Sequence, residues 1–160
     1  MKNFAIIIVI LLFSTSLYAQ KVDVKNDKIL VDGNPIATIV KEGCGFNKNC
    51  TFYVRNLQGK TLITVMMLDL YDPNEIQSSN PNGKIFYFRF SFADEKGVAE
   101  VAFTTMRAKS VAKIIVAAKL IKDNELDDNE VRNFVQAHGT WYSDRKTELN
   151  NPKQIIIINR

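Results

Sequence analysis

The segment Ile85–Phe92 alternates strictly between aromatic side chains and others. The aromatic positions are Phe86, Phe88, Phe90 and Phe92, and the residues between them are Tyr87, Arg89 and Ser91. A period of two is that of a β-strand, because successive side chains point to opposite faces of a sheet. Burying each of these rings contributes about 1.5–3 kcal/mol. The chain is therefore expected to fold around a β-sheet that has one aromatic face on the core.

Further runs of β-like composition surround this segment and are separated by turn residues. They are Lys21–Lys25, Lys28–Val31, Ile36–Val40, Thr51–Arg55, Leu62–Leu70 and Val98–Phe103. Because the runs follow one another closely, antiparallel hairpins are favoured over parallel crossovers. Leu62–Leu70 is apolar on both of its faces, which predicts a strand in the middle of the sheet, covered on both sides.

The periodicity changes to that of a helix between Thr104 and Lys122. One helical face carries Val111, Ile114, Ile115, Ala118 and Ile121. Ile114–Val116 alone also fits a short strand. A second helix is indicated by Asp127 as N-cap, Glu130 three residues later and Gly139 as the stop.

These patterns predict an α+β fold. We expect an antiparallel sheet of about six or seven strands, with two helices in the C-terminal half packed on one face. The aromatic face of Ile85–Phe92 should meet the apolar stripe of the first helix. A final run, Ile155–Ile158, is either the last strand of the sheet or a strand offered to another protein.

The amino terminus has the layout of a secretory signal peptide. Lys2 precedes an apolar run of ten residues, Phe4–Phe13, and a short polar stretch then leads to Ala19. Cleavage is expected after Ala19, or alternatively after Ser16, which leaves residues 20–160 as a single domain. An uncleaved anchor is the competing interpretation, but the strongly apolar part is short for a membrane span.

The chain has two cysteines, Cys44 and Cys50, and export would place both in an oxidising compartment. Their even number and this compartment predict a disulfide between them. A zinc site would need more ligands, and the chain has one histidine. Redox catalysis is disfavoured because the spacing is not Cys-x-x-Cys.

The junction Leu17-Tyr18-Ala19-Gln20 and the later stretch Ile29–Gly33 resemble those of small uncharacterised exported proteins of Gram-negative bacteria. The resemblance covers only these parts of the chain. It implies residence in the periplasm or outside the cell and implies no activity.

Residues suited to catalysis are few. His138 is the one imidazole, and no nucleophile lies near it in sequence. Asp69 and Asp72 could serve as paired carboxylates, although acids at strand ends are common in turns. The acidic stretch 123–130 departs from the calcium-loop pattern, since Asp128 stands where glycine is required. We therefore expect no cofactor and no metal site.

Two features suit recognition. Asp72–Lys84 is the longest connection, and its central residues Asn74, Glu75 and Ile76 could contact a partner. Trp141 and Tyr142 follow a helix end, where they form either an interaction pair or the border of the core.

The expected function is a non-catalytic binding module of the cell envelope. The alternatives are a carrier of a small apolar ligand or lipid and, less favoured, a hydrolase that uses carboxylates. A net charge of +4 gives no argument for nucleic acid binding.

Overall fold

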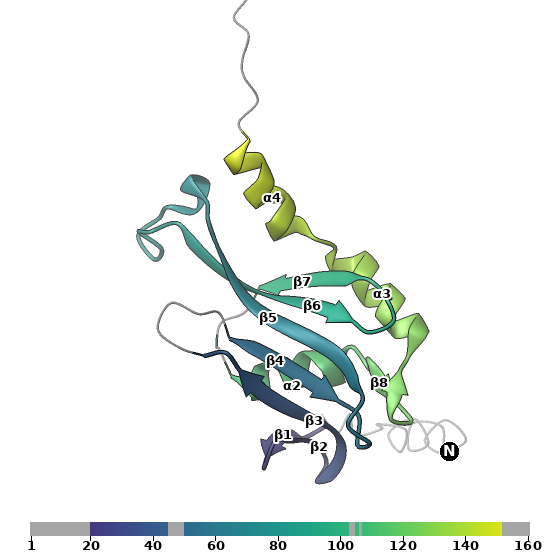
Figure 1. Ribbon diagram of the computed structural model, residues 1–160. Coiled ribbons are helices and arrows are strands. Elements are labelled where there is room, and N and C mark those ends of the chain that lie inside the picture. The colour runs from purple at the N-terminus through teal and green to yellow at the C-terminus, as the bar shows by residue number, and fades with distance from the viewer. Residues whose placement is uncertain (1–19, 45–49, 103–104, 106, 152–160) are drawn as a thin grey trace, which may run out of the picture.

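Seven strands form one antiparallel sheet in which each strand pairs with the next along the chain (Figure 1). The computed structural model describes residues 20–44, 50–102, 105 and 107–151. The strands are β1 (Val22–Lys25), β2 (Lys28–Val31), β3 (Asn34–Glu42), β4 (Thr51–Arg55), β5 (Thr61–Tyr71), β6 (Lys84–Phe92) and β7 (Val98–Ala102). The predicted antiparallel sheet is therefore confirmed. Residues 1–19 and 155–158 lie outside the described residues, so the signal peptide and the final strand stay predictions.

Tight turns set the hairpins of the first strands. Asn26 and Asp27 join β1 to β2 with φ angles of 50° and 56°. Two consecutive residues of positive φ form a type I′ turn, whose twist matches that of the flanking strands. Asp32 and Gly33 repeat this arrangement between β2 and β3. Asparagine, aspartate and glycine tolerate this conformation best, which explains why these sequences turn where they do.

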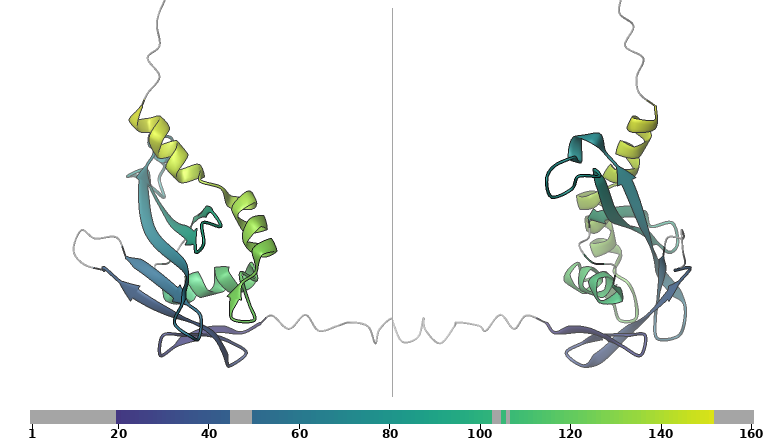
Figure 2. Two further views of the ribbon diagram at one scale, coloured as in Figure 1. Left: turned by 45° about the vertical axis from the view of Figure 1, so that its right-hand side comes forward. Right: turned by 90° about the vertical axis from the view of Figure 1, so that its left-hand side faces the viewer.

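Two helices of the C-terminal half pack on the concave face of the sheet, as predicted. These are α2 (Ala108–Ala117), which contacts β1, β2 and β3, and α3 (Asp128–His138), which contacts β7 (Figure 2). Asp127 caps α3 by accepting hydrogen bonds from the Asn129 and Glu130 backbone N–H groups at 3.1 and 3.2 Å. The α+β class and the second helix are thus confirmed.

The first helix is shorter than its sequence pattern. It ends at Ala117, and Lys119 adopts a left-handed φ of 52° that stops any continuation. Ile121–Lys122 forms a short strand, β8, which pairs with β9 (Glu125–Leu126) through the Asp123-Asn124 turn. The apolar side chain of Ile121 fitted the helical stripe equally well, so periodicity alone could not separate the two structures.

The core lies between the aromatic face of β6 and the two helices. Phe88 and Phe90 are completely buried and Phe92 nearly so, and they share one apolar cluster with Val111 and Ile115 of α2. The Phe134 ring of α3 makes edge contacts with Phe90 and Phe92, at centroid distances of 5.5 and 6.0 Å. The aromatic face therefore meets α3 as well as α2. Phe86 lies beyond this core, with 42% of its surface exposed.

On each edge strand of the sheet, a neighbouring group accepts a hydrogen bond from one backbone N–H. On β1, the Val24 backbone N–H donates to Asp23 Oδ1 at 2.9 Å, and the same carboxylate accepts from Lys109 of α2 at 3.0 Å. On β7, the Glu100 backbone N–H donates to the Gly139 carbonyl at 2.9 Å. Both contacts reduce the number of free donors that could pair with another chain.

Candidate functional site

An additional helix, α4 (Trp141–Asn150), directly follows α3 and lies on the other face of the sheet. The change of face follows from the contacts: α3 packs on Phe90, whereas α4 contacts Tyr87 and Arg89, which point away from the core. The chain crosses the β7 edge at Gly139, and Figure 2 shows α3 and α4 as a bent rod along that edge. The sequence patterns described above did not predict this helix.

Arg145 of α4 joins this helix to the long connection between β5 and β6. Its Nε and Nη2 atoms donate to the two carboxylate oxygens of Asp72 at 2.6 and 3.1 Å. Asp72 is buried, and its Oδ1 also accepts from the Asn74 backbone N–H at 2.9 Å, which starts the short helix η1 (Pro73–Glu75). The hydrogen bonds from Arg145 lower the pKa of the Asp72 carboxyl below its usual value.

A second carboxylate, Glu100 of β7, holds the beginning of α4. Its side chain is fully buried and accepts hydrogen bonds from the Ser143 backbone N–H at 2.9 Å and from the Ser143 hydroxyl. Arg89 Nη1 donates to Ser143 Oγ at 3.0 Å and lies 3.6 Å from Glu100 Oε1. Thr140, the N-cap residue, makes no side-chain capping bond. Glu100 thus supplies the acceptor that a helix N-terminus requires.

Aromatic rings form a further contact between α4 and the sheet. Tyr142 stacks on Tyr87 with centroids 4.7 Å apart, and Trp141 contacts Tyr142 edge-on at 4.8 Å. Burial raises the pKa of both tyrosine hydroxyls. Trp141 remains 53% exposed. The two residues of the predicted Trp141–Tyr142 pair therefore have different environments: Tyr142 borders the sheet, and Trp141 faces solvent.

An open groove of ≈ 280 Å³ runs between α4 and the end of β5. Its lining residues are Leu70, Tyr71, Pro73, Lys146, Leu149 and Asn150. Tyr71 is 58% exposed, and Ile76, whose side chain lies close to it, is 51% exposed. Gly83, with φ +56°, lies against both side chains, because a Cβ there would lie 3.0 Å from Ile76 Cγ1 and 3.3 Å from Tyr71 Cε2.

The structure places η1 and α4, which carry the predicted recognition residues, side by side. Asn74, Glu75 and Ile76 are exposed, and the charge of Glu75 contributes to the raised pKa of Tyr142. We define the η1–α4 surface as Tyr71, Asn74, Glu75, Ile76 and Trp141. Figure 1 shows η1 and the neighbouring turns beyond the main body of the sheet, on the same side as α4.

The candidate acids of the sequence analysis take part in structural contacts. Asp69 pairs with Lys84 at 3.2 Å, Asp72 binds Arg145, and Asp128 pairs with Lys96 at 2.6 Å. The His138 ring packs against Phe134 at the end of α3. Within residues 20–44, 50–102, 105 and 107–151, no group of three His, Cys, Asp or Glu side chains could hold a metal ion.

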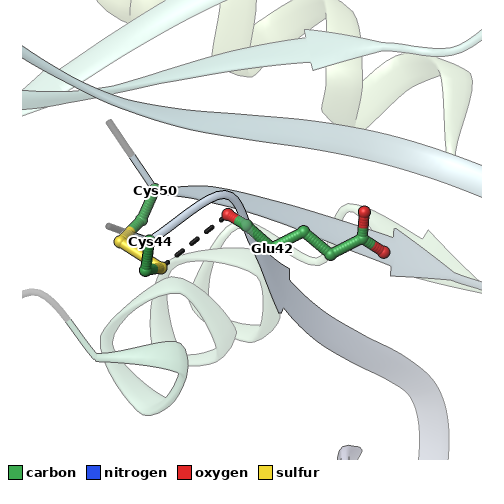
Figure 3. Close-up of a disulfide and its surroundings, with 3 residues drawn as sticks. All are labelled: Glu42, Cys44 and Cys50. Carbon is green, nitrogen blue, oxygen red and sulfur yellow. Dashed lines mark hydrogen bonds between the residues drawn. A yellow bond between two sulfur atoms is a disulfide. The ribbon is translucent and has the colours of Figure 1, made fainter. Parts of the chain in front are cut away.

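The predicted disulfide is present between Cys44 and Cys50, whose Cα atoms are 4.5 Å apart (Figure 3). It joins the end of β3 to the start of β4. The dashed line in Figure 3 marks a 3.7 Å contact between Cys44 Sγ and the carbonyl oxygen of Glu42. The bond closes the connection between two paired strands and so restricts the unfolded chain.

Comparisons with protein-family models, curated proteins and solved structures give no match. The function must therefore be argued from the geometry of this chain alone. Over the part of the chain that the structure describes, no helix combines the length and apolar character that crossing a bilayer requires.

The Asp72–Arg145 pair predicts a specific pH dependence. Because the pKa of Asp72 is lowered in the folded protein, its ionised form stabilises the fold above the pKa of an unfolded aspartate. This contribution should be lost as the pH falls through the lower, folded pKa. Asp72→Asn should therefore lose less stability between pH 6 and pH 3 than the wild-type protein, as measured by urea unfolding across that range. Equal losses in the two proteins would contradict the assignment.

Proposed function

We propose that this chain is an exported, non-catalytic binding module of the bacterial cell envelope. The observation that supports it best is the η1–α4 surface, where Tyr71, Ile76 and Trp141 are each more than half exposed. Exposed aromatic and large apolar residues beside a groove are typical of protein interaction sites. The Asp72–Arg145 pair fixes the two halves of this surface relative to each other, which reduces the entropy lost on binding.

Export rests on the predicted signal peptide and is supported by the disulfide, since such bonds persist in oxidising compartments. Residence in the periplasm or outside the cell, and the likeness to small exported Gram-negative proteins, belong to this proposal.

The carrier and hydrolase alternatives have less support. The space between the sheet and the two helices is filled by protein, because Phe52, Phe88 and Phe90 are completely buried there. A hydrolase would need carboxylates available to a substrate, whereas Asp69 and Asp72 already bind basic side chains. Neither alternative has an observation that favours it over binding.

The proposal is tested with two matched variants of the complete chain, purified with an affinity tag from the envelope fraction of the host. The first is Ile76→Ser with Trp141→Ser. The control is Leu57→Ser, at a residue that is 49% exposed but lies in the β4–β5 turn.

We expect a co-purifying partner with the wild-type protein and with the control. Its recovery from the double variant should fall at least tenfold, which corresponds to about 1.4 kcal/mol of binding energy. The melting temperatures should stay similar, because all three positions are exposed. Equal recovery from both variants, or no partner with the wild-type protein, would contradict the proposal.

A further inference from the structure

Gln20 is the first residue that the structure describes, and it lies just before β1. The next residue is held in place: the Lys21 backbone N–H donates to Asp32 Oδ1 at 2.9 Å, and the Asp32 backbone N–H donates to the Lys21 carbonyl oxygen at 2.9 Å. Gln20 itself is exposed and lies outside the strand. A chemical change confined to Gln20 would therefore leave the pairing of β1 intact.

The predicted cleavage after Ala19 makes Gln20 the amino-terminal residue of the exported chain. Such a glutamine carries an α-amine and a side-chain amide within one residue. The α-amine has a pKa of about 7.7–8.0, so a part of it is neutral and nucleophilic near neutral pH. Because amine and amide belong to the same residue, their reaction is intramolecular, which raises their effective concentration.

We propose that Gln20 of the exported protein is converted to its lactam, pyroglutamate. The α-amino nitrogen forms a bond to Cδ of the same side chain, and the bond from Cδ to Nε2 breaks. The amide nitrogen leaves as ammonia, with a proton that the amine gives up. The product is a five-membered ring, and the reaction needs no oxidant or other co-reactant. This inference rests on the export that belongs to the proposed function, because the α-amine of Gln20 exists only after cleavage at that position.

The surroundings of Gln20 suit the lactam better than a charged amine. An open groove of ≈ 320 Å³ between β1 and α2 is lined by Gln20, Val22, Lys113, Val116 and Ala117. An ammonium group on Gln20 would lie among apolar side chains and near a lysine of the same charge, and both disfavour the charged form. Cyclisation removes the terminal charge and gives the groove a compact neutral ring.

The test is the mass of the first peptide of the protein, recovered from the envelope fraction of the host directly into denaturant. Cleavage after glutamate releases residues 20–42 as one peptide, because Glu42 is the first glutamate after Gln20. An isotope-labelled synthetic peptide of the same sequence, with a free amino terminus, is added at lysis and reports cyclisation during handling. We expect the native peptide to be lighter than its unmodified sequence by one ammonia, while the labelled peptide stays largely unmodified.

Gln20→Asn is the matched control variant. Its side chain keeps the amide but is one methylene shorter, so the same reaction would have to form a strained four-membered ring. We expect this variant to be cleaved at the same position and to keep a free α-amine.

The possible results separate this inference from the proposed export. A native peptide that begins at Gln20 with a free amine, or that contains no more lactam than the labelled peptide, would overturn the inference and leave export intact. A peptide that begins at Leu17 would do the same, because cleavage after Ser16 leaves three residues before Gln20. Recovery of the uncleaved chain would overturn both the inference and the export.

Discussion

Replacing Phe90 by alanine should lower the free energy of unfolding by about 3–5 kcal/mol, the largest effect expected for a single substitution in this chain. The ring is completely buried and contacts Phe88 and Phe134 at centroid distances of 6.3 and 5.5 Å. Removing it leaves a cavity between the sheet and α3 that the surrounding side chains fill only partly. Denaturant unfolding followed by circular dichroism measures the loss.

The matched control is Tyr71→Ala, which removes a large ring that is 58% exposed. Its effect should stay within about 0.5 kcal/mol, as is usual at the surface. A loss below about 1 kcal/mol for Phe90→Ala would mean that this face of β6 does not carry the core, contrary to the packing of α3.

Removing the disulfide should cost about 2 kcal/mol, the second largest effect. The bond spans a sequence separation of six residues, so it closes a short loop and removes less entropy from the unfolded chain than a longer one would. The variant is Cys44→Ser with Cys50→Ser, measured by denaturant unfolding. Reducing agent should destabilise the wild-type protein by a similar amount and leave the variant unchanged. Wild-type stability that did not respond to reduction would contradict a structural role for the bond.

The sheet could be predicted because the sequence signals for its strands and turns each involve only neighbouring residues. Period-two alternation in Ile85–Phe92 and turn residues such as Asn26-Asp27 each act within a few positions, and β6 and the first turn are found where they indicate. The prediction that both faces of β5 are covered holds only in part. β5 lies between β4 and β6, but Met66 and Leu68 remain half-buried because the contacts of α4 lie toward the Leu70 end.

The site was less predictable because its contacts are distant in sequence. Ser143 lies 43 residues from Glu100, and Arg145 lies 73 residues from Asp72. Such pairs leave no periodic signal, and α4 itself has no apolar stripe that would mark it as a helix. Ile76 and Trp141 could be named as recognition candidates from the sequence because a long polar loop and a tryptophan after a helix end are unusual features in themselves. That the segments carrying them, η1 and α4, lie side by side could be learned only from the structure.

Photo-crosslinking in cells of the host tests the central claim, that the η1–α4 surface meets a partner, most directly. A benzophenone amino acid is placed at position 76 or 141 of the full-length precursor and, as a control, at position 57 in the β4–β5 turn. We predict one discrete adduct of the same mass increment from positions 76 and 141 and none from position 57. The same adduct from position 57, or no adduct from positions 76 and 141, would contradict the claim.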